Sequence, residues 1–457
     1  MTALLWDVQE ELLSQAEFLF EAWERSLDSA LFTLSEAAAG PEERLRANVM
    51  ALAVGGAPVY ERLLAPVLAR PDGDRYRTAA ATLAVLLGAR EQPRETALAA
   101  IAEAGEEGRW GLTRAFEIAN RKGIGRMLAR DLGEVSGPAL AGRLQALAAR
   151  RYDGKRRLCD WLADDDLEVA RAAAMLARHS TTAVALRALL PLLEHDDPRL
   201  RAAAIESALI RGLPGSWQVA CAIARGPAGD FYSAKGPPKD AASAQLWRRA
   251  LCWLAIQADE DAHRQLFAAL RASPGPTLLW AAGLSGRLEA VDLACELLDH
   301  PTLARLAGEV LCCVAGLPKD ERGYWLDDGA QGRFGADADE ALPALEDDNL
   351  DAELVPPAAL ALPLPDPGAA REWWSGQRPH LEPQNARFLG GEPLDGARLR
   401  WGMRELPTRR LQPLAIEAAM RSAGQLILDT RASARAQLAN LDASAAEIDC
   451  QRGMPLM

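Results

Sequence analysis

RRLCDWLADDDLEVARAAAMLARHS (156–180) and LRALLPLLEHDDPRLRAAAIESALIRG (186–212) are two copies of one pattern. They align with an offset of 31 residues, so that Leu162 matches Leu193 and Asp166 matches Asp197. Each copy holds an apolar helix, an acidic turn and a second helix with an alanine-rich patch. Alanine lets neighbouring helices approach closely, and an aspartate in the turn caps the helix that follows. The stretch from Arg156 to Gly212 therefore predicts two stacked helical hairpins.

This order of apolar helix, acidic turn and alanine-rich helix is that of a HEAT-type hairpin, and a period of about 20 to 50 residues indicates stacked units. We therefore expect an all-α fold, a HEAT-like α-solenoid of stacked helical hairpins with an acidic Pro-rich linker and a small C-terminal helical segment. The expected divisions are N-terminal hairpins in 1–150, the repeat core in 151–325, the linker in 326–370 and the C-terminal segment in 371–457. No sustained alternation of β-branched and aromatic residues competes with the helical pattern, so no strand is expected.

The first long segment, residues 3–39, illustrates the helical pattern. Its apolar residues recur at spacings of three and four, which places them on one helix face. The acidic residues of the segment take other faces, and they are Glu10, Glu11, Glu17, Glu21 and Glu24. We expect two further helices near the C-terminus, at about 395–404 and 408–422, with another helix beyond Asp429.

The charge balance restricts the kinds of partner. The chain has 51 basic and 64 acidic residues, a net charge of −13. A chain of this charge is repelled by phosphate backbones, so direct nucleic-acid binding is not expected and a basic protein partner is the electrostatic complement. Residues 334–370 contain no lysine or arginine but nine acids and six prolines, which indicates an extended acidic linker.

Two segments are the candidates for partner binding. One is the Pro/Gly-rich insertion at 226–240, whose exposed aromatic residues are typical of interface anchors. The other is the acidic linker, either a solvated tether or an arm that docks on a basic surface. The candidate residues are Phe231, Tyr232, Asp337, Asp339, Glu340, Glu346, Asp347, Asp348, Asp351 and Glu353.

No motif predicts catalysis, a metal site or a cofactor. The five histidines include no H-E-x-x-H pair, and the chain has neither a phosphate-binding G-x-x-x-x-G-K-[ST] loop nor a G-x-G-x-x-G loop. The Asp clusters at 164–166 and 196–197 would also suit metal-assisted hydrolysis, but they fall where helix caps are needed. His195 and His300 occupy equivalent turns and are interpreted as capping or surface residues. We therefore expect no enzymatic activity and no cofactor.

The cysteines, the N-terminus and the lack of a long apolar run predict the cellular compartment. The seven cysteines are scattered and form no C-x-x-C pair, which favours buried thiols in a reducing environment. The N-terminus meets acids at Asp7 and Glu10 without a basic region, unlike a signal peptide. Since no run of 18 apolar residues occurs, no transmembrane helix is expected, and the cytoplasm is the predicted location. The oligomeric state stays open.

Several further motifs carry a resemblance to a known family. They are RYDGKRRLCDWLADDDLEVARAAA (151–174), AGLP (315–318), WW (373–374), FLGGEPL (388–394) and TRRLQPLAIEAAMR (408–421). With them the chain resembles a bacterial family of HEAT-like proteins of unassigned activity, some of whose members are encoded beside type VI secretion genes. The likeness extends over about residues 1–425.

This resemblance implies a function through its genetic context. Toxins in such clusters are paired with immunity proteins, so the chain is expected to bind a cognate secreted effector, such as a nuclease toxin, and to neutralise it by occlusion. One alternative is an adaptor or chaperone that loads an effector onto the secretion spike. Another is an enzyme, such as a lyase-like HEAT protein that acts on a chromophore. The family has no catalytic residues to transfer to this chain.

Overall fold

The repeats of the opening stretch fold as neighbouring helices in a computed structural model of the chain. The structure describes residues 4–70, 73–226, 238–257, 259–326, 361–444 and 447–448. Over these residues the fold is all-α except for one short hairpin, which confirms the predicted fold class at that level. The N-terminal elements are α1 (Trp6–Ser26), α2 (Leu34–Ala37), the π-helical turn η1 (Ala38–Glu42), α3 (Glu43–Val54), α4 (Gly56–Val59), the π-helical turn η2 (Tyr60–Leu64), α5 (Ala65–Leu68), α6 (Arg75–Leu87), α7 (Gln92–Ala100), α8 (Glu106–Ile118), α9 (Ile124–Ala129) and α10 (Gly137–Ala148).

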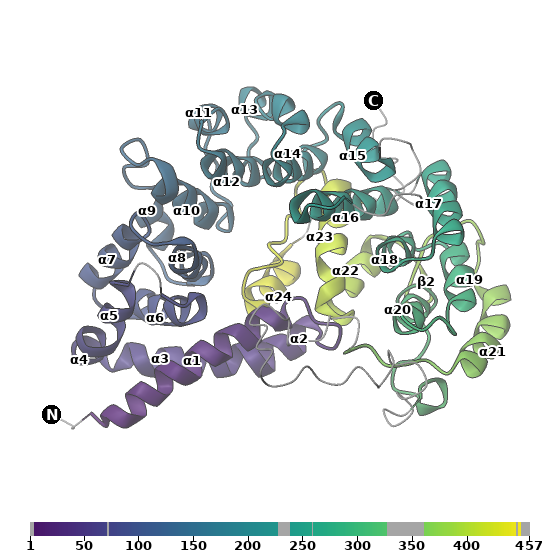
Figure 1. Ribbon diagram of the computed structural model, residues 1–457, viewed down its shortest axis with the longest axis horizontal. Coiled ribbons are helices and arrows are strands. Elements are labelled where there is room, and N and C mark those ends of the chain that lie inside the picture. Colours follow the sequence, from purple (N-terminus) through teal and green to yellow (C-terminus); the bar gives the residue numbers. More distant parts are fainter. Residues whose placement is uncertain are drawn as a thin grey trace.

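The middle of the chain continues as helices that pack in sequence order. Its elements are α11 (Arg157–Leu162), α12 (Leu167–Ala177), α13 (Ala183–Arg187), the 3-10 turn η3 (Leu190–Glu194), α14 (Pro198–Ile210), α15 (Ser216–Arg225), α16 (Ala241–Ile256), α17 (Glu260–Ala272), α18 (Pro276–Leu284), α19 (Leu288–Glu296), α20 (Ala304–Val310), the π-helical turn η4 (Leu311–Ala315) and the 3-10 turn η5 (Arg322–Tyr324). Contacts run from α6 to α8, α10, α12, α14, α16, α18 and α20, each helix packing against the next. These helices follow a curved path (Figure 1).

The acidic turns cap helices, as predicted. Asp166 Oδ1 accepts hydrogen bonds from the N–H groups of Glu168 (2.9 Å) and Val169 (3.3 Å) at the start of α12. Asp197 Oδ1 accepts from the Leu200 N–H (2.7 Å) at the start of α14. The alanine patches of these two helices are buried, so α12 and α14 pack closely against each other.

The two turn histidines also have a local structural role. His195 Nδ1 accepts a hydrogen bond from the Asp197 N–H (3.0 Å), and His300 Nδ1 accepts one from the Thr302 N–H (3.3 Å). Each imidazole therefore bonds a backbone N–H two residues ahead, in the turn that precedes α14 or α20, while Asp197 itself caps α14.

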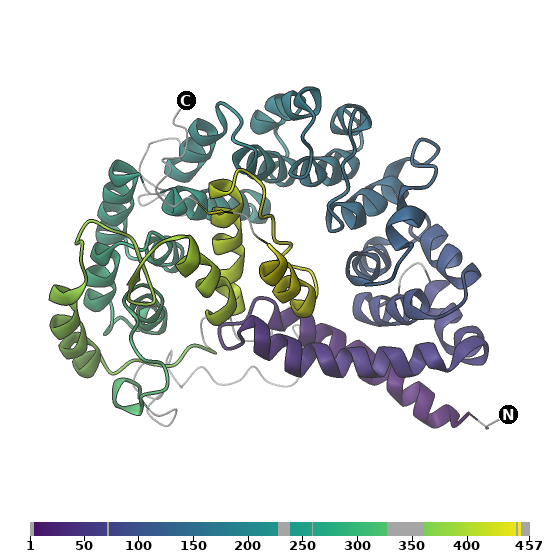
Figure 2. The same ribbon diagram turned by 180° about the vertical axis from the view of Figure 1, so that it is seen from behind.

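The C-terminal part of the chain begins beside α19 on the outer side of the curve and then continues along its inner side (Figure 1). Its elements are α21 (Pro367–Gln377), the 3-10 turn η8 (Arg378–His380), β1 (Phe388–Leu389), β2 (Glu392–Pro393), α22 (Gly396–Glu405), the 3-10 turn η9 (Thr408–Arg410), α23 (Leu411–Arg421) and α24 (Ala434–Ala443). Helix α23 contacts α14 and α16, while α22 and α24 contact α2. Figures 1 and 2 both place α24 beside α2, so the C-terminal helices connect the beginning of the chain to its middle.

The short hairpin differs from the expectation that no strand forms. Strands β1 and β2 are antiparallel and two residues each, and Phe388 pairs with Pro393. Gly390 and Gly391 form the turn with φ of 59° and 85°, a conformation that suits a tight hairpin. The two glycines allow this hairpin, and its strands are too short to show an alternating pattern of β-branched and aromatic residues. The sequence therefore did not predict them.

This hairpin packs on the end of the repeat helices. The N–H groups of Gly390 and Gly391 donate to the carbonyls of Cys313 (2.6 Å) and Val314 (2.9 Å) in η4. Gly316 follows η4 with φ of 83°, and a Cβ placed there would lie 2.8 Å from the carbonyl oxygen of Gly390. The AGLP and FLGGEPL motifs, far apart in the sequence, are therefore in direct contact.

Within the part of the chain that the structure describes, no single helix combines the length and the apolar composition needed to cross a bilayer. The bent pair Leu34–Val54 and Gly56–Leu68 meets those criteria only as a pair, with an angle of 106° between its members.

Candidate functional site

The predicted partner-binding residues lie outside the described residues. They are Phe231, Tyr232, Asp337, Asp339, Glu340, Glu346, Asp347, Asp348, Asp351 and Glu353. The structure does describe the residues that flank the two segments that carry them. Those residues define where each candidate segment is attached.

The first segment is attached between two adjacent helices. Helix α15 ends at Arg225, α16 begins at Ala241, and the two helices pack against each other. The Trp247 indole N–H donates to the carbonyl of Ala224 (3.1 Å), and Asp240 caps α16 through the N–H of Ser243 (2.8 Å). Both ends of the insertion are therefore held at one edge of the helical row.

The acidic segment is attached at a single place as well. Trp325 and Pro365 form an antiparallel bridge, and the N–H of Leu326 donates to the carbonyl of Leu364 (2.9 Å). Beyond the bridge, Asp366 caps α21 through the N–H of Ala369 (2.9 Å). Leu362 and Leu364 are buried, so the last part of the predicted linker belongs to the core. The described residues on the two sides of the acidic segment, Leu326 and Leu364, are therefore in direct contact.

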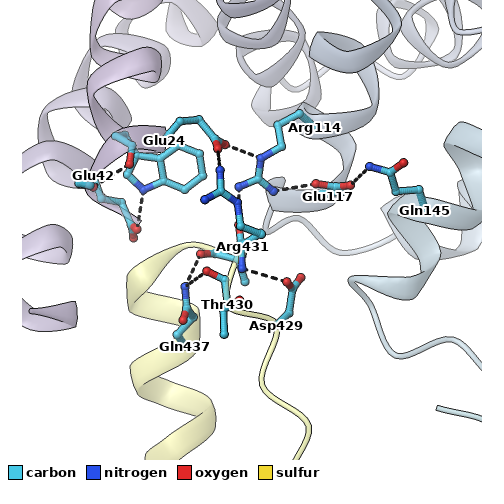
Figure 3. A network of polar contacts seen from close by, with 12 residues as sticks. Glu24, Glu42, Arg114, Glu117, Gln145, Asp429, Thr430, Arg431 and Gln437 are labelled. Carbon is cyan, nitrogen blue, oxygen red and sulfur yellow. Dashed lines mark hydrogen bonds and ion pairs between the residues drawn. The ribbon is translucent and has the colours of Figure 1, made fainter. Parts of the chain in front are cut away.

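A buried polar cluster joins the first helix to the C-terminal segment, and we call it the central joint: Glu24, Arg114, Glu117 and Arg431. Glu24 of α1 binds the guanidinium groups of Arg114 and Arg431 through separate oxygens. Arg114 of α8 also donates to Glu117 Oε2 (2.7 Å). Figure 3 shows Glu24 facing both arginines. Only 4% of the Glu24 side chain and 5% of the Arg114 side chain are exposed, so this ion pair is desolvated.

A second carboxylate beside the central joint holds the start of α24. Glu42 accepts from the Trp23 indole N–H (3.2 Å) and from the backbone N–H of Arg435 (3.2 Å). It also accepts from the N–H of Ala434, at the first residue of α24. The carboxylate therefore satisfies donors at a helix N-terminus that lies 392 residues away in the chain.

Burial shifts the acid–base equilibria around the central joint. Desolvation raises the pKa of Glu117, and the nearby Asp429 raises it further against the opposing effect of Arg114. Desolvation opposes the charge of Arg114, but Glu24 and Glu117 outweigh it and raise the pKa of this guanidinium. Burial lowers the pKa of His179 to about 3, so this imidazole is neutral at physiological pH.

These residues line a hollow of about 190 Å³ between α8, α10, α12 and the segment at 427–431. Both oxygens of Glu24 are occupied by guanidinium groups, and those of Glu117 by Arg114 and the Gln145 amide (2.7 Å). Each of these carboxylate oxygens therefore accepts a hydrogen bond from another part of the chain, which is the arrangement of a structural joint. Among the described residues, no three His, Cys, Asp or Glu side chains gather where they would hold a metal ion.

A second joint lies between the repeat helices and the motifs at 388–394 and 408–421. Glu417 of α23 binds Arg421 Nε (2.6 Å) and Arg387, and Arg387 Nε donates to the carbonyl of Ser285 (2.7 Å). Glu309 of α20 accepts from Arg410 Nε (3.1 Å). The pKa of Glu417 is low although burial opposes its charge, because Arg387 and Arg421 together outweigh desolvation.

Sequence reasoning did not identify these joints. Glu24 was expected on a face other than the apolar one, but it is buried and binds Arg431 of the C-terminal segment. Local periodicity cannot show that a segment distant in the sequence packs over a helix. Two features of the sequence could have indicated the second joint, the RR pair at 409–410 and the GG pair at 390–391. Both lie where the C-terminal segment contacts α20 and η4. No family model matches the chain, and no curated protein is similar to it at a significant level.

Proposed function

We propose that the chain is a HEAT-like α-solenoid that binds one secreted effector of a type VI secretion system and neutralises it by occlusion. This is the immunity role that the family resemblance implies. The serial packing of α6 to α20 supports the solenoid, because each helix of the row contacts its neighbours in sequence order. Such stacks usually bind other proteins through their faces and loops.

The observation that carries the proposal is the anchoring of the acidic segment. The bridge between Trp325 and Pro365 fixes the two ends of the segment side by side on the folded body. Residues 337–353 between them carry eight of the chain's acids and no basic residue. An acidic segment held at one defined place is suited to meet a basic surface of a partner and to accelerate association.

The overall charge supports a basic partner. At a net charge of −13 the chain attracts proteins of opposite charge and repels nucleic acid. A nuclease toxin must carry basic residues to bind its own substrate, so the acidic segment would compete for that surface. Occlusion therefore explains the acidic composition and requires no catalytic site in this chain.

Co-expression tests the proposal. Each effector encoded beside the gene for this chain would be produced in a susceptible host, with and without the chain. Restored growth with the chain present, together with co-purification of the pair, is the expected result. Growth inhibition that persists despite full production of both proteins would contradict the proposal.

The same system distinguishes an adaptor from an immunity protein. Deleting the gene of an adaptor would abolish effector secretion and leave the producer alive. Deleting the gene of an immunity protein would poison the producer or its siblings. We expect the second result.

A further inference from the structure

A second hollow lies where the beginning, middle and end of the chain meet. Its volume is about 440 Å³, within the range of small-molecule sites. Helices α16 and α18 form one wall, and residues from η9 and α23 form the other. It is separate from the hollow of the central joint and shares no lining residue with it.

Three guanidinium groups line this hollow, and they belong to Arg248, Arg249 and Arg409. The side chains of Arg248 and Arg249 form no hydrogen bond or ion pair with any described residue. Arg409 Nη1 is buried and has no hydrogen-bond partner there, while its Nε lies 3.7 Å from Glu309. Asp28 is the one carboxylate in the lining. A cationic hollow in a chain of net charge −13 is a local reversal of the overall charge.

The wall formed by α18 adds to this positive character. The helix begins at Pro276 after Gly275, and no side chain caps its N-terminus. Pro276 and Thr277 both line the hollow. An uncapped helix N-terminus presents free N–H groups and a partial positive charge, which favour an anion.

Aromatic and apolar side chains complete the lining. Trp253, Trp280 and Ile416 contribute to the walls. The Arg409 guanidinium lies 4.4 Å from the centroid of the Trp280 ring, which holds the cation in place from one side. A ligand that fits these walls needs an apolar body in addition to its charge.

We propose that this hollow binds a small organic oxyanion, a phosphate or carboxylate group attached to an apolar or aromatic body. Arg248, Arg249 and Arg409 bind the oxygens, since guanidinium groups match the geometry of both kinds of oxyanion. The indole ring of Trp280, which is partly exposed, contacts the body of the ligand. This inference is independent of the proposed effector binding.

The carboxyl group of Asp28 allows a test of whether charge controls ligand binding in this hollow. Burial raises the pKa of this carboxyl, against the opposing effects of Arg409 and Arg431. When ionised, the carboxylate repels a bound anion. Asp28→Asn should therefore strengthen anion binding, whereas a purely structural hollow would give no gain.

Calorimetric titration of the full-length chain tests the proposal, with phenyl phosphate, benzoate, inorganic phosphate and uncharged phenol as probes. The expected result is saturable binding of phenyl phosphate or benzoate that weakens with added salt, with little binding of phenol. Whichever of the two aromatic anions binds more tightly shows whether the hollow prefers a phosphate or a carboxylate group. Binding of inorganic phosphate alone, or of no probe at millimolar concentration, would overturn the proposal.

Matched variants locate the binding. Arg248→Gln with Arg249→Gln should weaken it by about tenfold or more. The control, Arg44→Gln with Arg199→Gln, removes two exposed arginines outside the hollow and makes the same change in net charge. It should leave the affinity unchanged. Asp28→Asn should strengthen binding roughly threefold or more. Equal weakening in both double variants, or no gain with Asp28→Asn, would place the anion elsewhere.

Discussion

Glu24 in the first helix and Arg431 near the C-terminal end of the described chain form an ion pair across 407 residues of sequence. The carboxylate is 4% exposed and the guanidinium 47% exposed, so the pair spans from the interior to the surface. With Arg114 as the second partner of Glu24, this contact fixes the C-terminal segment to the first helix. The segment at 431 is thereby joined to both α1 and α8.

Glu24→Gln should destabilise the chain because it leaves the desolvated Arg114 with only Glu117 as a charged partner. The expected loss in free energy of unfolding is about 2–4 kcal/mol, measured by urea denaturation. Glu21→Gln is the control on the same helix, because Glu21 pairs with Arg25 at the surface. It should cost less than about 1 kcal/mol. Equal losses in the two variants would contradict a structural role for the joint.

Gly316→Ala tests the contact between the AGLP and FLGGEPL motifs. Its Cβ would lie 2.8 Å from the Gly390 carbonyl oxygen at a residue with φ of 83°. The matched control is Gly212→Ala, where φ is 64° and no atom lies within 4 Å of the added Cβ. The control carries backbone strain alone, about 1–2 kcal/mol, and Gly316→Ala should cost at least about 1 kcal/mol more. Thermal and urea denaturation measure the stability loss of both variants. If Gly316→Ala loses no more stability than Gly212→Ala, the hairpin can shift to accommodate the added Cβ.

Acid should destabilise the chain through His263. Burial lowers its pKa from 6.5 to about 4, and its ring bonds the carbonyl of Ala255 (2.7 Å) and accepts from Arg287 Nε (3.3 Å). The neutral form is therefore favoured in the folded state. Its contribution to stability is full above about pH 6.5 and is lost as the pH falls toward 4, by at most about 1.4 kcal/mol per pH unit.

Urea denaturation at pH 7 and pH 5 checks this effect. His263→Gln should lose less stability on acidification than the parent chain, because one titrating group has been removed. His380→Asn replaces an exposed histidine and should follow the parent. Identical acid losses in the parent and His263→Gln would contradict the assignment.

Neutralising the acidic segment should slow association with the effector. In the variant, Asp347, Asp348 and Asp351 become asparagine, which removes three charges from the proposed docking arm. Stopped-flow association rates should fall most at low salt and converge with the parent at high salt. The control makes the same charge change at three exposed acids elsewhere, Glu103→Gln, Glu134→Gln and Asp165→Asn. Equal association rates in the two triple variants would show that the acidic segment has no specific role in binding the effector.

Local patterns predicted local structure well. The caps formed by Asp166 and Asp197 follow from an aspartate placed just before an apolar helix. The helices at 396–405, 411–421 and 434–443 were also expected, within a few residues. Each of these predictions depends on residues within one or two helical turns of one another.

Long-range contacts could not be predicted in the same way. Helical periodicity assigned Glu24 to a face other than the apolar one, but Glu24 is buried together with Phe20 and Trp23 of the same helix. Arg409 and Arg410 were expected only as part of a helix at about 408–422, and nothing local indicates that Arg410 is buried against Glu309. Such pairs require knowledge of which distant segments meet, which one sequence does not contain. The predicted partner-binding residues lie outside the described part of the chain and stay predictions.

Titrating purified effector with the purified chain tests the central claim most directly. If the chain is an immunity protein, the toxic activity of the effector should fall linearly and reach background at one equivalent of chain. An adaptor would also form a complex, so binding alone does not decide between the two roles. Full effector activity in a saturated complex would contradict neutralisation by occlusion.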